Sequence, residues 1–289
     1  MIGGLFSGAV TSCAVAYVAD ITDEENRTKG MGLVGMAIGL GFVIGPAVGG
    51  LLSTFSLSVP FFASSSLALV TLFFCLMFLE ESLDAEARRE RAKQPRVSRW
   101  KAFQGALKFL YALGFIVSFT LAGLESVLQY FQRQAFGAGP THIGTMLLIS
   151  GIVGAAIQGG IIRRLVKPGT ETRVIVIGLL LCTAGFFLLL ASDSFLTATV
   201  YLCVFSSGNA LVRPCVTSLI TQKTTVGQGA ASGLSSSMDS LGRIAGPLFA
   251  TTLFTVDRVL PFVLCGLICL ASLVFVYGFR RQSRETAAV

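Results

Sequence analysis

Charged residues are scarce in this sequence. Of its 289 residues, 13% are charged and 53% are hydrophobic, and the mean hydropathy is +0.77. A soluble globular domain carries about a quarter charged residues, because water meets most of its surface. The shortage of charge therefore argues against a soluble globular protein, and we expect lipid to surround most of the chain.

Histidine and tryptophan are nearly absent, with one residue of each. The seven cysteines all lie in apolar runs and form no C-x-x-C pair. Thiols in such positions are typical of small buried residues and not of disulfides or metal sites. We therefore expect no catalytic residue, no metal, no cofactor and no enzymatic activity.

Long apolar runs are what the sequence has in abundance. Nine runs are each about 20 residues long, the length that crosses a hydrocarbon core of roughly 30 Å. They lie at residues 1–19, 30–52, 58–79, 104–130, 142–162, 173–192, 195–220, 228–255 and 260–279. The predicted fold class is an all-α membrane protein with nine transmembrane helices.

Lysine and arginine are distributed unevenly between the predicted loops. Seventeen fall on the side that holds the polar 80–101 segment and the C-terminus, and two fall on the opposite side. Because positively charged loops stay in the cytoplasm, we expect a multi-pass protein of the cell membrane with a cytoplasmic C-terminus. The net charge of +7 is thus explained by membrane loops, and we expect no nucleic-acid partner.

A repeat relates two of the predicted spans. Two glycines and a proline recur at an offset of 201 residues, as Gly41 and Gly242, Gly45 and Gly246, and Pro46 and Pro247. A duplicated unit of this kind predicts two parallel helical bundles. The first bundle is expected over residues 1–79, a cytoplasmic linker over 80–103, a six-helix bundle over 104–279 and a cytoplasmic tail over 280–289. On this count, three helices of the first bundle would precede residue 1.

The second span also carries a motif. The run Gly41-Phe-Val-Ile-Gly45-Pro46-Ala-Val-Gly49-Gly50 resembles the GxxxGPxxGG signature of major facilitator antiporters. In the second half, Glu125-Ser-Val-Leu-Gln and Arg213-Pro214 follow the order seen in drug:H⁺ antiporters of the twelve-helix class. Within that class the chain is most similar to bacterial quinolone and multidrug efflux pumps.

This resemblance implies both a fold and an activity. The fold is that of the major facilitators without the first three transmembrane helices. The activity is proton-coupled efflux of drugs or small amphipathic molecules, cationic ones among them, by alternating access. The partners are the lipid bilayer, the substrate and protons, and the full-length protein is expected to be monomeric. The quinolone-type pumps have an acidic residue three positions before the Arg-Pro pair, where this chain has Ala210.

Four charged residues inside predicted spans are candidates for proton coupling or substrate binding, namely Glu125, Asp239, Arg243 and Arg213. A charge in the membrane is costly and usually faces a cavity or a partner. Asp239 and Arg243 are four residues apart, so they share a helix face and can pair. Such a pair could do no more than neutralise two costly charges. Alternatively, Asp239 could replace the acidic residue that this chain lacks at position Ala210. For Glu125 the two interpretations are a proton carrier and a carboxylate that reaches head-group water. For Arg213 they are a side chain that binds an anionic group and one that stabilises the packing of the bundle.

Polar and aromatic side chains near these charges are candidates for lining a cavity, since drug sites combine apolar walls with a few polar groups. They are Gln129, Tyr130, Phe131, Gln158 and Asn209. For each of them, a packing or lipid-facing position is the alternative.

The remaining candidates are structural. Close helix packing is expected of the antiporter motif (Gly41, Gly45, Pro46, Gly49 and Gly50) and of its counterpart (Gly242, Gly246 and Pro247). Asp20 and Arg27 flank a predicted cytoplasmic loop, where a gating ion pair competes with a plain solvated loop. Two other functions stay open, namely an inactive fragment of a transporter and a major facilitator importer or exporter of a sugar or metabolite.

Overall fold

The structure, a computed structural model, divides into two compact units, Met1–Arg96 and Val97–Val289. It describes residues 13–14, 17–18, 21–22, 37, 41, 44–45, 48–56, 58–79, 103, 105–162, 169–224 and 228–287. Within these residues the regular structure is helical, without a strand. This agrees with the predicted all-α class.

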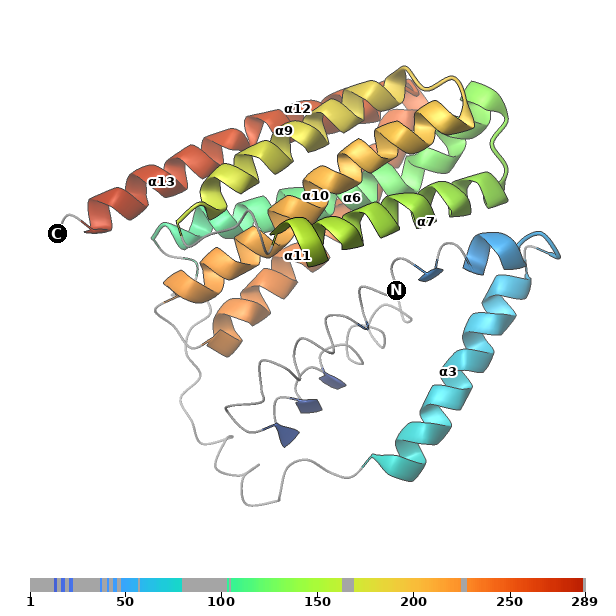
Figure 1. The fold of residues 1–289 in the computed structure, drawn as a ribbon, viewed down its shortest axis with the longest axis horizontal. Coiled ribbons are helices and arrows are strands. Elements are labelled where there is room, and N and C mark those ends of the chain that lie inside the picture. Colours follow the sequence, from blue (N-terminus) through green and yellow to red (C-terminus); the bar gives the residue numbers. More distant parts are fainter. Residues whose placement is uncertain are drawn as a thin grey trace. The chain divides into compact units, whose positions relative to one another are not determined.

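In the first unit, helix α3 spans Val59–Phe78 (Figure 1). Pro60 lies in its first turn, where a missing N–H costs no helical hydrogen bond. No residue of α3 is buried, and apolar side chains lie on all its faces. A helix that is apolar all round suits lipid, so α3 fits the span predicted at 58–79.

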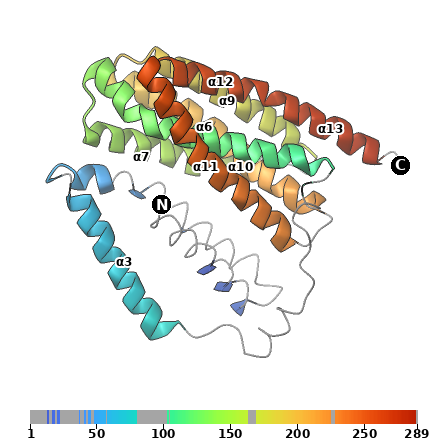
Figure 2. The same ribbon diagram turned by 180° about the vertical axis from the view of Figure 1, so that it is seen from behind.

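The second unit is a bundle of long helices (Figures 1 and 2). Its elements are α6 (Leu107–Phe136), α7 (Pro140–Ala156), the π-helical turn η1 (Ile157–Ile161), α9 (Glu171–Leu190), α10 (Phe195–Lys223), α11 (Gln228–Val256), α12 (Leu260–Ala271) and α13 (Leu273–Ala287). Glycine and capping residues set the ends of several helices. Gly137 ends α6 with a left-handed backbone (φ 73°), and the Ser194 hydroxyl accepts the N–H of Thr197 at the start of α10.

Six described segments are long and apolar enough to cross a membrane. They are Val59–Phe78, Leu107–Phe136, Pro140–Gly160, Glu171–Leu190, Phe195–Lys223 and Leu260–Ser283. They match six of the nine predicted spans. The predicted spans at 1–19 and 30–52 lie mostly outside the described residues. Helix α11 forms over the predicted 228–255 span but is not among these six.

Glycine lets α11 lie directly on α6 (Figure 2). A Cβ added at Gly242 would lie 2.6 Å from the carbonyl oxygen of Phe115. One added at Gly246 would meet the carbonyl oxygen of Phe119. Because these obstacles are backbone atoms, only glycine fits at this crossing.

A second close crossing joins α9 and α10. A Cβ at Gly178 would lie 2.8 Å from the carbonyl oxygen of Gly208, and one at Gly185 would lie 2.6 Å from Cβ of Phe205. Around these crossings the large side chains pack into two apolar clusters, one that includes Tyr111 and another that includes Phe186. The first crossing positions α11 on α6, and the second positions α10 on α9.

The antiporter motif of the first unit is described only in part. In the described surroundings of Gly41, Gly45 and Gly49, no atom lies within 4 Å of an added Cβ. Pro46, Asp20 and Arg27 lie outside the described residues, as does most of the predicted linker. The close packing expected at this motif therefore stays a prediction.

Candidate functional site

An ion pair between two membrane helices is the centre of the candidate site. Nη2 of Arg213 on α10 donates to Oδ2 of Asp239 on α11 at 3.4 Å. The Asp239 side chain is 26% exposed and that of Arg213 is 42% exposed, so the pair lies at the surface of the bundle and not in its core. The structure thus joins two of the four charged candidates, which lie on different helices.

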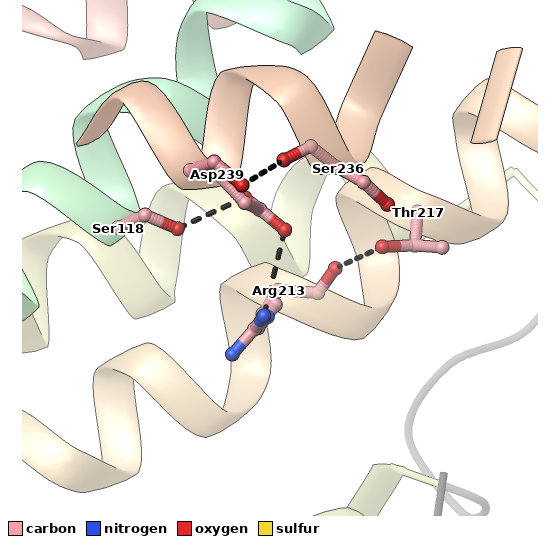
Figure 3. A network of polar contacts seen from close by, with 6 residues as sticks. Ser118, Arg213, Thr217, Ser236 and Asp239 are labelled. Carbon is pink, nitrogen blue, oxygen red and sulfur yellow. Dashed lines mark hydrogen bonds and ion pairs between the residues drawn. The ribbon is translucent and has the colours of Figure 1, made fainter. Parts of the chain in front are cut away.

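Helix α6 supplies a third group to this network (Figure 3). The Ser118 hydroxyl donates to Oδ1 of Asp239 at 2.9 Å. Gly114, one turn earlier on α6, also faces the carboxylate, since a Cβ there would be in ordinary contact with Oδ1 at 3.7 Å. Each oxygen of Asp239 therefore has a donor, one neutral and one cationic.

The network lies far from the ends of the helices that carry it. Asp239 is 11 residues from the start of α11 and Arg213 is 10 residues from the end of α10. At 1.5 Å per residue both lie about 15 to 17 Å from the same end of the bundle. An acid placed alone at mid-membrane costs about 2.5 to 3.5 kcal/mol on insertion scales, so a cationic partner at the same depth is expected.

Arg243 and Glu125 form the next layer of charge. Arg243 follows Asp239 by one turn of α11, and it interacts electrostatically with Glu125 on α6. Helices α6 and α11 run parallel here, since Ser118 lies beside Asp239 and, further along both helices, Tyr130 lies beside Phe254. The four charged candidates therefore form two pairs of opposite sign, one between α10 and α11 and one between α11 and α6.

The cavity-lining candidates divide between surface and core. Gln129 and Tyr130 are exposed on α6, and the Tyr130 ring lies 6.3 Å from that of Phe254. Phe131 is 6% exposed and packs at 4.5 Å on the ring of Phe262, so it belongs to the core of the bundle. Phe131 therefore occupies a packing position, which was the alternative to lining a cavity.

Two further candidates lie on neighbouring helices. Asn209 is half-buried on α10 and shares a face with Arg213, one turn away. Gln158 is exposed in the π-helical turn η1, next to Gly159 and Gly160. Single π-helical turns within α-helices are frequent at functional sites, which keeps Gln158 a candidate.

Sequence reasoning missed several polar partners. Ser118 gave no signal, because a serine in an apolar run is common in membrane helices and does not reveal which helix it faces. The sequence likewise does not reveal which helix Gln132 faces. Gln132 is buried, and its amide donates to the Ser192 hydroxyl at 3.0 Å. Among the described residues, no cluster of His, Cys, Asp and Glu could hold a metal ion.

Comparison with known proteins gives a family match over most of the chain. The sequence model described as the Major Facilitator Superfamily matches residues 1–247. Multidrug resistance protein 2 of Bacillus subtilis is 31% identical, over all of this chain and 74% of its own length. The quinolone resistance protein NorA of Staphylococcus aureus is 25% identical, over 96% of this chain and 71% of its own length.

Solved structures of two proteins resemble the fold. The human organic anion transporter MFSD10 (TETRAN) superposes with a TM-score of 0.67 at 27% identity, covering 92% of this chain and 67% of its own. A bacterial homologue of the lysosomal transporter Spinster superposes with a TM-score of 0.64 at 11% identity, covering 94% of this chain and 74% of its own. The second likeness concerns the fold alone.

Proposed function

This chain belongs to the Major Facilitator Superfamily and is a membrane-embedded transporter, and from this membership we propose that it is a proton-coupled exporter of drugs or other small amphipathic molecules. The names of its bacterial relatives, a multidrug resistance protein and a quinolone resistance protein, support the substrate class. The proposal includes transport by alternating access, in which the substrate site opens to one side of the membrane at a time.

The observation that carries the proton coupling is the carboxylate of Asp239. It lies midway along a membrane helix, with Arg213 of α10 at 3.4 Å and Ser118 of α6 at 2.9 Å. Because its partners lie on two other helices, a change in the charge of Asp239 alters the attraction between helices. Where the quinolone-type pumps have an acidic residue, this chain has Ala210 on α10, and the proposal assigns the part of that acid to Asp239 on α11.

Proton binding then couples to movement through this ion pair. When Asp239 takes up a proton, its charge is lost and the attraction to Arg213 weakens. Arg213 becomes available to a different partner, and α10 and α11 can shift relative to each other. Loss of the proton restores the pair. Since each proton taken from outside is released inside, the inward proton gradient drives export.

The same proposal includes the finer topology. Nine transmembrane helices, three more preceding them in a twelve-helix plan, and a cytoplasmic C-terminus remain predictions from the apolar runs, the repeat and the loop charges.

Transport of organic anions is the second candidate function. It is favoured by the two arginines, Arg213 and Arg243, and by the likeness to the human organic anion transporter.

The test is dye efflux from bacterial cells that lack their own multidrug pumps. We expect cells expressing this chain to expel a cationic dye, and an uncoupler to stop the efflux. Asp239→Asn should remove the uncoupler-sensitive efflux, because the amide cannot exchange a proton. An anionic dye measured in parallel distinguishes the second candidate.

Two variants make the result interpretable. Asp193→Asn neutralises an exposed carboxylate in the α9–α10 loop and should leave efflux unchanged. Asp239→Asn combined with Arg213→Gln removes both charges, so that no arginine is left unpaired if the single variant fails to fold. Uncoupler-sensitive efflux by a folded double variant would refute the coupling role of Asp239.

A further inference from the structure

A cleft at one end of the second unit shares no residue with the candidate site around Asp239. Its volume is about 380 Å³, and it is lined by the start of α9, the end of α10 and the last part of α13. These three segments lie at the same end of the bundle (Figure 1). The predicted topology places this end at the cytoplasmic face of the membrane.

Three cationic side chains converge on the cleft from three different helices. They are Arg173 of α9, Lys223 of α10 and Arg280 of α13. Nζ of Lys223 donates to the Ser283 hydroxyl at 3.1 Å, which holds the ammonium group at the cleft. In the described part of the chain, no ion pair joins any of these cations to a carboxylate.

One carboxylate also lines the cleft. Glu171 is 3% exposed, and its Oε2 accepts the N–H of Gly169 at 2.7 Å. Its charge is therefore directed at the loop before α9 and hidden from the opening. Three cations against one buried carboxylate leave the cleft positively charged.

The wall and the rim of the cleft have different chemistry. Leu219 and Phe279 are both buried and give an apolar wall. The hydroxyls of Thr172 and Ser283 add hydrogen-bond donors beside the cations. Several cations with hydroxyl donors suit a phosphate group, and an apolar wall between helices suits the acyl chain attached to it.

We propose that this cleft binds the phosphate group of an anionic membrane lipid. The cytoplasmic leaflet is rich in anionic lipids, and basic pockets between membrane helices on that side bind their head groups. Free inorganic phosphate offers the same charge without an acyl chain, so the two sources can be separated experimentally. The inference does not depend on the substrate or on proton coupling, because none of the lining residues belongs to the candidate site around Asp239.

Native mass spectrometry of the full chain in a neutral detergent tests the proposal. We expect the chain to retain dioleoyl phosphatidylglycerol in preference to phosphatidylcholine. Lys223→Gln and Arg280→Gln should each weaken phosphatidylglycerol binding about fivefold, and together about 25-fold, if each cation contributes about 1 kcal/mol. Both side chains reach the surface, so the variants should fold, which thermal unfolding checks.

The matched control is Lys108→Gln. Lys108 is an exposed cation in the first turn of α6, outside the cleft. An equal loss of binding in this control, or unchanged binding in the Lys223 and Arg280 double variant, would overturn the proposal. Inorganic phosphate that competes with phosphatidylglycerol for the wild type but not for the double variant supports a phosphate site. It also identifies the occupant as free phosphate and not as a lipid head group. All these measurements report lipid binding, so they stand whether or not the chain exports drugs.

Discussion

At the scale of single residues, the function proposed for this transporter depends on a few charges in an apolar setting. Asp239 and Arg213 neutralise each other across two helices, and Ser118 completes the coordination of the carboxylate. Glu125 and Arg243 add a second pair of opposite charges on α6 and α11. Charged groups are costly in membrane spans, and pairing with a group of opposite sign lowers that cost.

Glu125→Gln is the residue-scale prediction. Glutamine keeps the size and hydrogen-bonding capacity of the side chain but cannot carry a proton, so uncoupler-sensitive dye efflux should be lost while the protein stays folded. The neighbouring Ser126→Ala is a suitable control, because the Ser126 hydroxyl donates within its own helix to the carbonyl oxygen of Gly123 at 2.7 Å. Unchanged efflux in Glu125→Gln would remove this carboxylate from the mechanism.

At the scale of helices, glycine decides which faces meet. Gly242 and Gly246 bring α11 onto the backbone of α6, and this contact places Ser118 beside Asp239. Helix α10 continues through Pro214, and α11 continues through Pro247. The polar network is therefore positioned by close backbone contact between unbroken helices.

Gly246→Ala tests that positioning. The added methyl group would meet the carbonyl oxygen of Phe119, so α11 must move away from α6. We expect a loss of about 1 to 3 kcal/mol in the free energy of unfolding. Gly233→Ala on the same helix meets no described atom within 4 Å and should be neutral or slightly stabilising. Unfolding in detergent compares the two, and equal stability would mean that the crossing tolerates a side chain.

At the scale of the whole molecule, charge asymmetry predicts how the chain lies in the membrane. In the second unit, Arg173, Lys223 and Arg280 lie at one end of the bundle and Arg133 lies at the other. The positive-inside rule places the first group in the cytoplasm. The substrate site would then open between an extracellular end poor in cations and a cytoplasmic end rich in them.

Cysteine labelling in intact cells checks this orientation. Thr141→Cys, at the exposed start of α7, should react with a membrane-impermeant maleimide from outside. Gln222→Cys, exposed near the end of α10, should react only after the membrane is permeabilised. The wild-type chain, with its seven cysteines in apolar runs, gives the background. The reverse pattern would refute the predicted topology.

The sequence by itself determined the all-helical class, most of the spans and the candidates for charge in the membrane. Each of these follows from local properties, because hydrophobic length and helical spacing act within one segment. Sequence also offered Arg243 as a same-helix partner for Asp239, since residues four apart share a face. It could not supply Ser118, which comes from a different helix.

Only the tertiary structure decided which helices face each other. It gave Asp239 the partners Arg213 and Ser118, buried Phe131 against Phe262, and gathered three cations into one cleft. Contacts between helices depend on which faces can approach closely, and in this bundle glycine at the crossings sets that approach. The physical reason is that helical periodicity fixes neighbours along one helix, whereas packing chooses neighbours between helices.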